Sequence, residues 1–243
     1  MNDRFLRIQM LLGEPAMERL AAAHVCVLGL GGVGSWCAEA LARSGVGALT
    51  LMDQDRVELT NLNRQAQALT STLGLPKAEA MARRVADISP ACKVRPVVGR
   101  YEPAARETFF STDYDYIVDA IDLVSCKLDL IETALARKIP ILSALGTGNK
   151  LDAAALRVSD ISKTEGCPLA RVVRKELRAR GIHHHKVVWS PEPAHPAAQP
   201  ETPPPGRRSV PASVMWVPAA AGLLLAGEVV MDLTAGLREG EPS

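Results

Sequence analysis

Two spacings of apolar residues alternate along the first 150 positions. Short β-rich apolar runs predict strands, and longer runs with a period near 3.6 residues predict helices. The predicted strands span residues 24–29, 48–53, 93–98, 116–119 and 140–143. The predicted helices span residues 33–44, 76–88 and 127–137. Strands alternating with helices of this length indicate βαβ units, so we expect an α/β, Rossmann-like, mostly parallel open sheet with helices on both faces.

The texture of the chain changes after about residue 150. Residues 151–160 read as a pair of short extended segments, 168–180 as a basic helix and 186–190 as a strand. Residues 191–211 hold eight of the seventeen prolines and cannot bury enough apolar surface to order themselves, so we expect a mobile loop. We predict a nucleotide-binding domain over 1–160 and a short C-terminal extension over 161–243, both within one globular unit.

Residues 214–233 form a mostly apolar run that is long enough to cross a bilayer. The run nevertheless contains Pro218, Glu228 and Asp232, and a carboxylate facing lipid is costly. We therefore favour a buried or amphipathic terminal helix over a membrane span, and expect no stable membrane insertion.

The composition restricts the class of protein further. With 243 residues, 47% of them hydrophobic and 23% charged, the chain has the balance of a soluble globular domain. A formal net charge of +1 gives no global attraction to nucleic acid or membrane, so any basic surface must be local. The five cysteines are scattered and never spaced as Cys-x-x-Cys, which argues against disulfides and a four-cysteine zinc site. No signal peptide is apparent, and we expect a cytoplasmic protein.

A glycine-rich turn lies between the first predicted strand and its helix. Its glycines are Gly29, Gly31, Gly32 and Gly34, and they let the backbone approach a phosphate at the helix N-terminus. Asp53 ends the next strand, where a carboxylate can bind ribose hydroxyls. Two alternatives remain open for this motif alone, namely a turn without ligand and the site of an NAD-dependent enzyme.

Charged residues downstream favour ATP cleavage over hydride transfer. Asp55 doubles the carboxylate at the strand end, Arg64 follows Asn61, and Lys77 begins a helix. Cations aimed at the phosphates stabilise charge that grows on a leaving pyrophosphate. Asp122 follows another strand at the carboxyl edge of the sheet, where it can hold Mg²⁺ against the phosphates. Taken singly, Arg64 and Lys77 could be surface charges, and Asp122 could be a helix cap.

As a set, these motifs resemble the ubiquitin-activating-enzyme-like superfamily of the ThiF/MoeB type, over roughly residues 4–160. The resemblance implies that Asp53 binds ribose, that Asn61, Arg64 and Lys77 contact the triphosphate, and that Asp122 is the Mg²⁺-linked catalytic carboxylate of an ATP-dependent adenylating enzyme. An arginine near the N-terminus often completes the partner subunit's site in this superfamily. Arg7 is the best match, so the resemblance also implies a homodimer. Alternatively, Arg7 is a solvated helix residue.

Several later segments are similar to the tRNA threonylcarbamoyladenosine dehydratase family (TcdA, also called CsdL). They are residues 144–150, 160–164 and 213–228. This similarity implies that tRNA is the substrate and that ATP activates the threonyl carboxylate of threonylcarbamoyladenosine beside the anticodon. Intramolecular attack then closes a ring. The similarity also implies sulfur-relay proteins as partners. Adenylation of a ubiquitin-like sulfur carrier is the alternative, against which the missing Cys-x-x-Cys pairs count. A non-catalytic binding subunit is a third alternative.

Two further features admit a functional reading. Cys167 stands at a predicted helix start, near where thioester-forming relatives keep a catalytic cysteine, although a plain helix-start residue is the favoured interpretation. The basic helix carries Arg171, Arg174, Lys175 and Arg178 on one face and, with Arg207-Arg208, is a candidate RNA-binding surface; a solvated face is the alternative. Three consecutive histidines, 183–185, suggest a metal site, but adjacent side chains diverge and we do not expect one.

Overall fold

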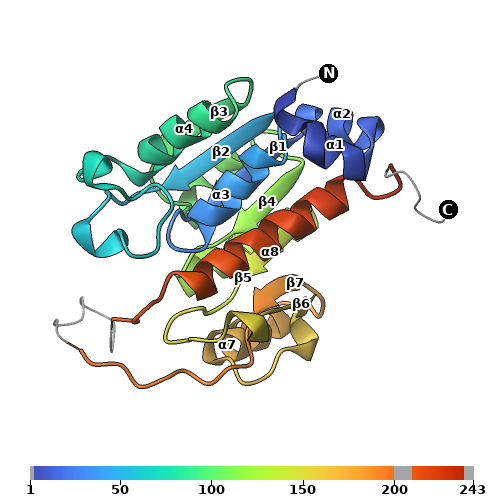
Figure 1. Cartoon of the computed structure of the whole chain (residues 1–243). Coiled ribbons are helices and arrows are strands. Elements are labelled where there is room, and N and C mark those ends of the chain that lie inside the picture. Colours follow the sequence, from blue (N-terminus) through green and yellow to red (C-terminus); the bar gives the residue numbers. More distant parts are fainter. Residues whose placement is uncertain (1–2, 200–209, 238–243) are drawn as a thin grey trace.

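The computed structural model describes residues 3–199 and 210–237, in which helices alternate with the strands of one sheet (Figure 1). The strands are β1 (His24–Leu28), β2 (Ala48–Asp53), β3 (Lys93–Val98), β4 (Tyr116–Asp119), β5 (Ile141–Ala144), β6 (Arg157–Asp160) and β7 (Lys186–Trp189). The α-helices are α1 (Leu6–Leu12), α2 (Glu14–Ala22), α3 (Gly34–Arg43), α4 (Lys77–Ile88), α5 (Arg106–Phe109), α6 (Val124–Ala136), α7 (Pro168–Ala179) and α8 (Trp216–Leu233). Short 3₁₀ turns lie at Asp3–Phe5, Leu59–Asn61, Thr70–Thr72, Pro103–Ala105, Ala153–Ala155 and Ile161–Lys163.

The described strands form a seven-stranded sheet in the order β3-β2-β1-β4-β5-β7-β6. All neighbouring pairs are parallel except β6 and β7, which run antiparallel. The chain order reverses between β1 and β4, and open α/β sheets bind ligands at the carboxyl ends of the strands beside such a reversal. The expected Rossmann-like architecture is confirmed. The sheet continues past residue 160, because β7 lies between β5 and β6; the division into two regions stays a prediction.

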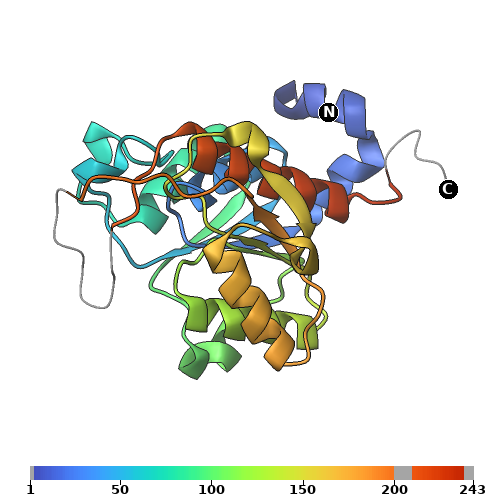
Figure 2. The same cartoon turned by 90° about the horizontal axis from the view of Figure 1, so that it is seen from below.

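Alternate residues of β1 enter two different cores. Val25 and Val27 face a cluster shared with α3, α4 and α8, whereas Cys26 and Leu28 face a cluster shared with α5, α6 and α7. Seen from below, these two groups of helices lie on opposite sides of the sheet (Figure 2). A strand covered on both faces needs a continuous apolar run, which is why β1 shows no polar alternation.

The last helix, α8, lies lengthwise beside α3 (Figure 1). Gly222 permits this closeness, since a Cβ added there would lie 2.3 Å from the Val33 carbonyl oxygen. The helix is long and apolar enough to cross a membrane, yet half of its span is buried within the protein. Its two carboxylates, Glu228 and Asp232, both pair with Lys186 of β7 at 2.8 Å. Packing against α3 therefore accounts for the apolar character of residues 214–233, in agreement with the expected buried or amphipathic terminal helix.

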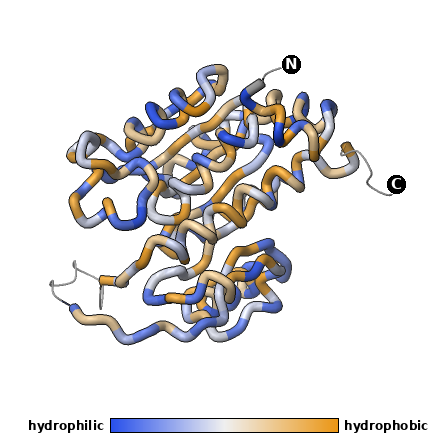
Figure 3. The backbone as a smooth tube through the Cα atoms, in the orientation of Figure 1, coloured by the Kyte–Doolittle hydropathy of each residue, from blue (hydrophilic) through white to orange (hydrophobic). Residues whose placement is uncertain are grey.

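The sequence missed several elements and misplaced others. The helices α1 and α2 were not predicted, and α6 begins at Val124 rather than at residue 127. In 151–160, the first expected extended segment is the 3₁₀ turn Ala153–Ala155, and only the second is a strand. The tube coloured by hydropathy (Figure 3) shows apolar and polar residues mixed along the N-terminal helices, and α1 buries no residue at all. The expected mobile loop lies partly outside the described residues, which also exclude Arg207 and Arg208.

Candidate active site

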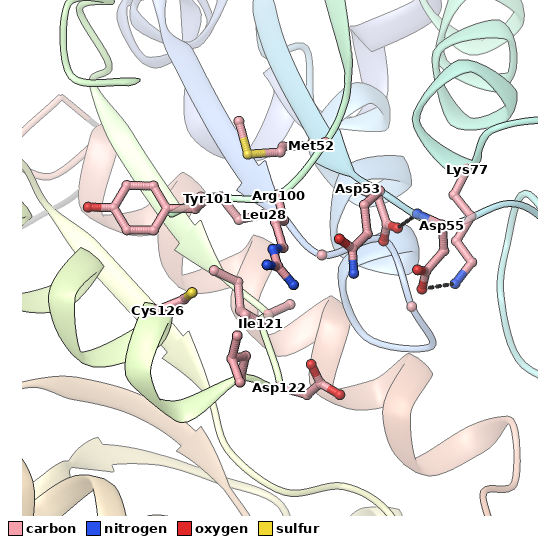
Figure 4. A pocket seen from close by; sticks show the side chains of 16 residues that line it. Leu28, Met52, Asp53, Asp55, Lys77, Arg100, Tyr101, Ile121, Asp122 and Cys126 are labelled. Atoms are coloured by element: carbon pink, nitrogen blue, oxygen red, sulfur yellow. Dashed lines mark hydrogen bonds and ion pairs between the residues drawn. The ribbon is translucent and has the colours of Figure 1, made fainter. Parts of the chain in front are cut away.

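A cavity of about 420 Å³ opens at the carboxyl edge of the sheet, where the loops after β1, β2, β3 and β4 meet (Figure 4). Six of the residues proposed from sequence line it. They are Gly29, Gly31, Asp53, Asp55, Lys77 and Asp122. The fold thus brings together residues separated by almost a hundred positions, because parallel strands end at a common edge.

The glycine loop is shaped by close packing at two positions. A Cβ on Gly34 would lie 1.8 Å from the Gly29 carbonyl oxygen, and one on Gly29 would lie 2.6 Å from the Ala120 carbonyl oxygen. Gly29 also has φ +84°, which disfavours a side chain. Gly31, by contrast, faces the cavity, and a Cβ added there would meet no other atom within 4 Å. Gly31 therefore leaves room for a ligand, whereas Gly29 and Gly34 are required by packing.

Asp53 ties the glycine loop to the end of β2. Its two carboxylate oxygens accept hydrogen bonds from the Leu30 N–H at 2.6 Å and the Asp55 N–H at 2.8 Å. Burial raises the pKa of this carboxyl group, and the two N–H donors and Lys77 oppose the shift. A carboxylate offers about four acceptor positions, so two remain for a ligand's hydroxyl groups.

Lys77 supplies a fixed positive charge at the same end of the cavity. Its Nζ lies 3.0 Å from an Asp55 carboxylate oxygen, and its side chain is only 8% exposed. Asp122 lines another wall, on the loop between β4 and α6 (Figure 4). Leu123, rather than Asp122, occupies the N-cap position of α6.

The structure does not bring the remaining proposed residues into the described cavity lining. Arg64 donates to the Thr60 carbonyl and the Asn63 side chain, and burial lowers the pKa of its guanidinium. A Cβ on Gly32 would lie 3.3 Å from Arg64 Cγ, so Arg64 still borders the glycine loop. Asn61 is buried and accepts from the Glu58 N–H at 3.2 Å.

Arg7 is exposed on α1, at the end of the molecule away from the carboxyl edge (Figure 1). Within one chain it is therefore not part of this cavity, and its proposed role needs a second copy.

Arg100 and Tyr101 are among the lining residues that were not proposed from the sequence. Both follow directly on Gly99 after β3, at the same edge, and the rule that located Asp53 would have located them. Arg100 pairs with Glu102 at 2.6 Å. The Tyr101 hydroxyl donates to Asp129 at 2.5 Å, and burial together with that carboxylate raises the pKa of the phenol.

Cys167, His184 and His185 make contacts within the protein. Cys167 is 4% exposed and accepts a weak hydrogen bond from the Ala170 N–H at the start of α7. His184 points to Asp160, while His185 points to Ser143, so neighbouring rings do diverge. Among the described residues, no group of three metal-ligating side chains comes together.

The doubly wound sheet and the cavity at its reversal point define a nucleotide-binding α/β protein. The family model for the ThiF family matches residues 3–234. The chain belongs to the ThiF family.

Two relatives are similar to this chain over nearly its whole length. It is 41% identical over 242 residues to the tRNA threonylcarbamoyladenosine dehydratase of Bacillus subtilis, covering 96% of this chain and 95% of that protein. The crystal structure of the E. coli tRNA N6-threonylcarbamoyladenosine dehydratase TcdA in complex with ATP superposes with a TM-score of 0.86 at 37% identity, covering 96% of this chain and 94% of that one.

A third relative, the molybdopterin-synthase adenylyltransferase of Salmonella typhimurium, is 36% identical over 126 residues, about half of each chain. The resemblance inferred from the motifs is confirmed.

Proposed function

We propose that this protein is an ATP-dependent dehydratase that cyclises threonylcarbamoyladenosine in tRNA, next to the anticodon, through activation of the threonyl carboxylate. One observation carries the proposal. The cavity joins a glycine loop, a ribose-type carboxylate, a fixed lysine and a further aspartate, in a chain similar from end to end to dehydratases of this name.

The cavity walls fit ATP in one orientation. Gly31 leaves open space against the backbone, as a phosphate chain requires, and Asp53 keeps acceptor capacity for a ribose. Lys77 marks the side where the phosphates lie, because its ammonium is the buried cation of the lining. Arg64 borders the glycine loop, and both Arg64 and Asn61 would reach the triphosphate only after a side-chain rearrangement.

Adenylation turns a poor electrophile into a reactive one. The substrate carboxylate attacks the α-phosphorus of ATP, pyrophosphate leaves, and a nucleophile tethered to the same substrate then displaces AMP. Tethering makes the ring closure effectively unimolecular, so no enzyme thiol is needed. The burial of Cys167 agrees with such a reaction.

Asp122 is suited to hold an Mg²⁺ ion that also binds the phosphates of ATP. Its carboxylate is exposed in the cavity lining, and hard cations prefer oxygen ligands of this kind. The ion would neutralise charge that develops on the leaving pyrophosphate. Asp122 and Lys77 thus approach the phosphates from different walls.

The tRNA surface includes α7. Arg171, Lys175 and Arg178 are exposed, and they can neutralise phosphates at sites one helical turn apart. Arg174 is less accessible, because it donates to the carbonyl and hydroxyl of Thr164. The active form is a homodimer in which Arg7 crosses to the partner's phosphates. We further expect a cytoplasmic location and sulfur-relay partners.

Nucleoside mass spectrometry tests the reaction. The purified protein, ATP, Mg²⁺ and tRNA bearing threonylcarbamoyladenosine should yield a nucleoside lighter by one water, together with AMP and pyrophosphate. Conversion of a carrier protein's C-terminus with no change in the tRNA would establish the sulfur-carrier alternative instead.

A complementation assay tests the crossing arginine. Arg7→Ala and Asp122→Asn homodimers should each be weak, and a mixed heterodimer should regain one intact site. Absence of recovery on mixing would contradict the shared site.

A further inference from the structure

A network of hydrogen-bonded, buried polar side chains lies behind the cavity. Asp119, Lys127 and Ser143 are each fully buried, and they come from β4, α6 and β5. The Asp119 Oδ2 atom accepts from Lys127 Nζ at 2.6 Å and from the Ser143 hydroxyl at 2.7 Å. Ser143 stands opposite Asp119 in the β4–β5 register, so the strand pairing itself fixes this contact.

The hydrogen-bonded network includes one more residue, His185. His185 Nε2 lies 2.8 Å from the Ser143 oxygen. The Ser143 hydroxyl has one proton, which goes to the acceptor-only carboxylate of Asp119, so His185 must donate through Nε2–H. His185 Nδ1 then carries no proton, and it has no hydrogen-bond partner among the described residues. The proton positions between His185 and Asp119 are thereby determined. Lys127 Nζ donates to Asp119 and also to the Ala144 carbonyl oxygen at 3.1 Å.

The second oxygen of Asp119 faces the loop between β4 and α6, which carries Asp122. Oδ1 accepts from the Ile121 N–H at 3.0 Å, one residue before Asp122. On the other side of this turn, the Ala120 N–H donates to the Leu28 carbonyl at 2.9 Å, and the Ala120 carbonyl packs against Gly29. The turn from 119 to 122 is therefore held both by the glycine loop and by the Asp119 carboxylate.

A buried ion pair is a poor source of stability, because desolvation of the two charges offsets their attraction. An apolar pair of similar volume would fill the same space between β4 and α6. What an apolar residue cannot supply is an acceptor for the Ile121 N–H. The turn next to Asp122 depends on that acceptor.

We infer that Asp119 is a positioning residue: its carboxylate, held by Lys127 and Ser143, sets the backbone turn that presents Asp122 to the cavity. The inference rests on the proposed function in so far as Asp122 is the carboxylate that acts on the phosphates. The Lys127 side chain holds the Asp119 carboxylate in its orientation, and it is too deeply buried to touch a substrate.

Two double variants separate positioning from stability. Asp119→Asn with Lys127→Met removes both charges but keeps an amide oxygen for the Ile121 N–H. Asp119→Leu with Lys127→Met removes both charges and the acceptor. The two proteins have the same net charge, and the residues at 119 have equal numbers of side-chain heavy atoms. They differ mainly in the polar contacts of that side chain with the Ile121 N–H and the Ser143 hydroxyl.

In the leucine pair, kcat should fall while the affinity for ATP stays nearly unchanged. We expect the asparagine pair to keep kcat for the cyclised nucleoside within about fivefold of the parent. The leucine pair should lose about fiftyfold or more, with the dissociation constant for ATP within about threefold, since a misplacement near 1 Å can cost about a hundredfold in rate. Equal kcat in the two pairs, or equal losses in kcat and ATP affinity, would overturn the inference.

Crystal structures of both pairs give a readout independent of turnover. The turn 119–122 should superpose on the parent in the asparagine pair and shift in the leucine pair. If the parent makes no cyclised nucleoside, the proposed function fails while this comparison still decides the inference; an unmoved turn in the leucine pair contradicts it. If the leucine pair does not fold, Asp119→Val with Lys127→Met repeats the comparison with a side chain suited to a strand.

Discussion

The Lys77 ammonium lies 3.0 Å from an Asp55 carboxylate oxygen at the edge of the cavity, and the Lys77 side chain is only 8% exposed whereas that of Asp55 is 57% exposed. The lysine is therefore fixed by the fold, and the aspartate is the partner that can turn away to solvent. A triphosphate that displaces Asp55 would find the cation already in place. Preorganised charge of this kind stabilises a transition state without reorganisation during the reaction.

Lys77→Met should lower kcat/KM for ATP by about a hundredfold, because the variant keeps the aliphatic stem and loses only the charge. Lys77→Arg should recover part of the loss. Steady-state AMP release measures both. Lys163→Met, at an exposed position on the 3₁₀ turn after β6, is the matched control and should resemble the parent. A Lys77→Met enzyme within threefold of the parent would remove Lys77 from the site.

Two glycines of the same loop should respond in opposite ways. Gly34→Ala places a Cβ 1.8 Å from the Gly29 carbonyl oxygen, so the free energy of unfolding should fall by roughly 3 kcal/mol or the protein should not fold. Gly31→Ala meets nothing within 4 Å and should leave the free energy of unfolding within about 1 kcal/mol. It should weaken ATP binding, since its Cβ enters the cavity. Urea unfolding and calorimetric titration with ATP distinguish the two, and a stable Gly34→Ala protein is the contrary result.

Cys167→Ser and Asp122→Asn separate ring closure from thioester chemistry. The serine variant should turn over tRNA at close to the parent rate, because the attacking group belongs to the substrate and serine can also accept the Ala170 N–H. Asp122→Asn should still bind ATP but lose about a hundredfold or more in rate. Nucleoside mass spectrometry follows both. An inactive serine variant, with an enzyme thioester in the parent, would favour carrier activation.

His185 should make the protein sensitive to mild acid. Burial lowers its pKa to about 4, from an ordinary value of 6.5. The unfolded chain therefore binds this proton more readily than the folded one, so stability is complete above pH 6.5 and is lost as the pH falls towards 4. From pH 7 to pH 5 the loss should be about 2 kcal/mol.

His184 provides the matched control for this pH dependence, because its ring is 84% exposed beside Asp160. Urea unfolding at pH 7 and pH 5 should show a much smaller decline for His185→Gln than for the parent. His184→Gln should decline as the parent does. An equal decline in the free energy of unfolding from pH 7 to pH 5 in all three proteins would show that His185 is not the titrating group.

The parallel core of the sheet and three of its loops could be predicted from the sequence because the signals are local. Each strand of the parallel core is a short apolar run, and the glycine turn, Asp53 and Asp122 each follow directly on such a run. Arg100 and Tyr101 follow the same rule but lie after β3, an edge strand whose exposed positions weaken the apolar signal. The network of Lys127, Ser143 and His185 could not be predicted, because it depends on the lateral order of strands, which no local pattern encodes.

The packing of α8 on α3 has a consequence for the synthesis of the chain. The helix α3 ends at Arg43, while the helix that covers it begins only at Trp216. At translation rates of roughly 5–20 residues per second, roughly ten seconds or more separate the emergence of the two helices. During that interval the part of α3 that α8 covers has no permanent partner in the nascent chain. Completion of this domain therefore awaits the synthesis of residues 216–233, and a chain terminated before residue 216 should expose the apolar surface that α8 covers.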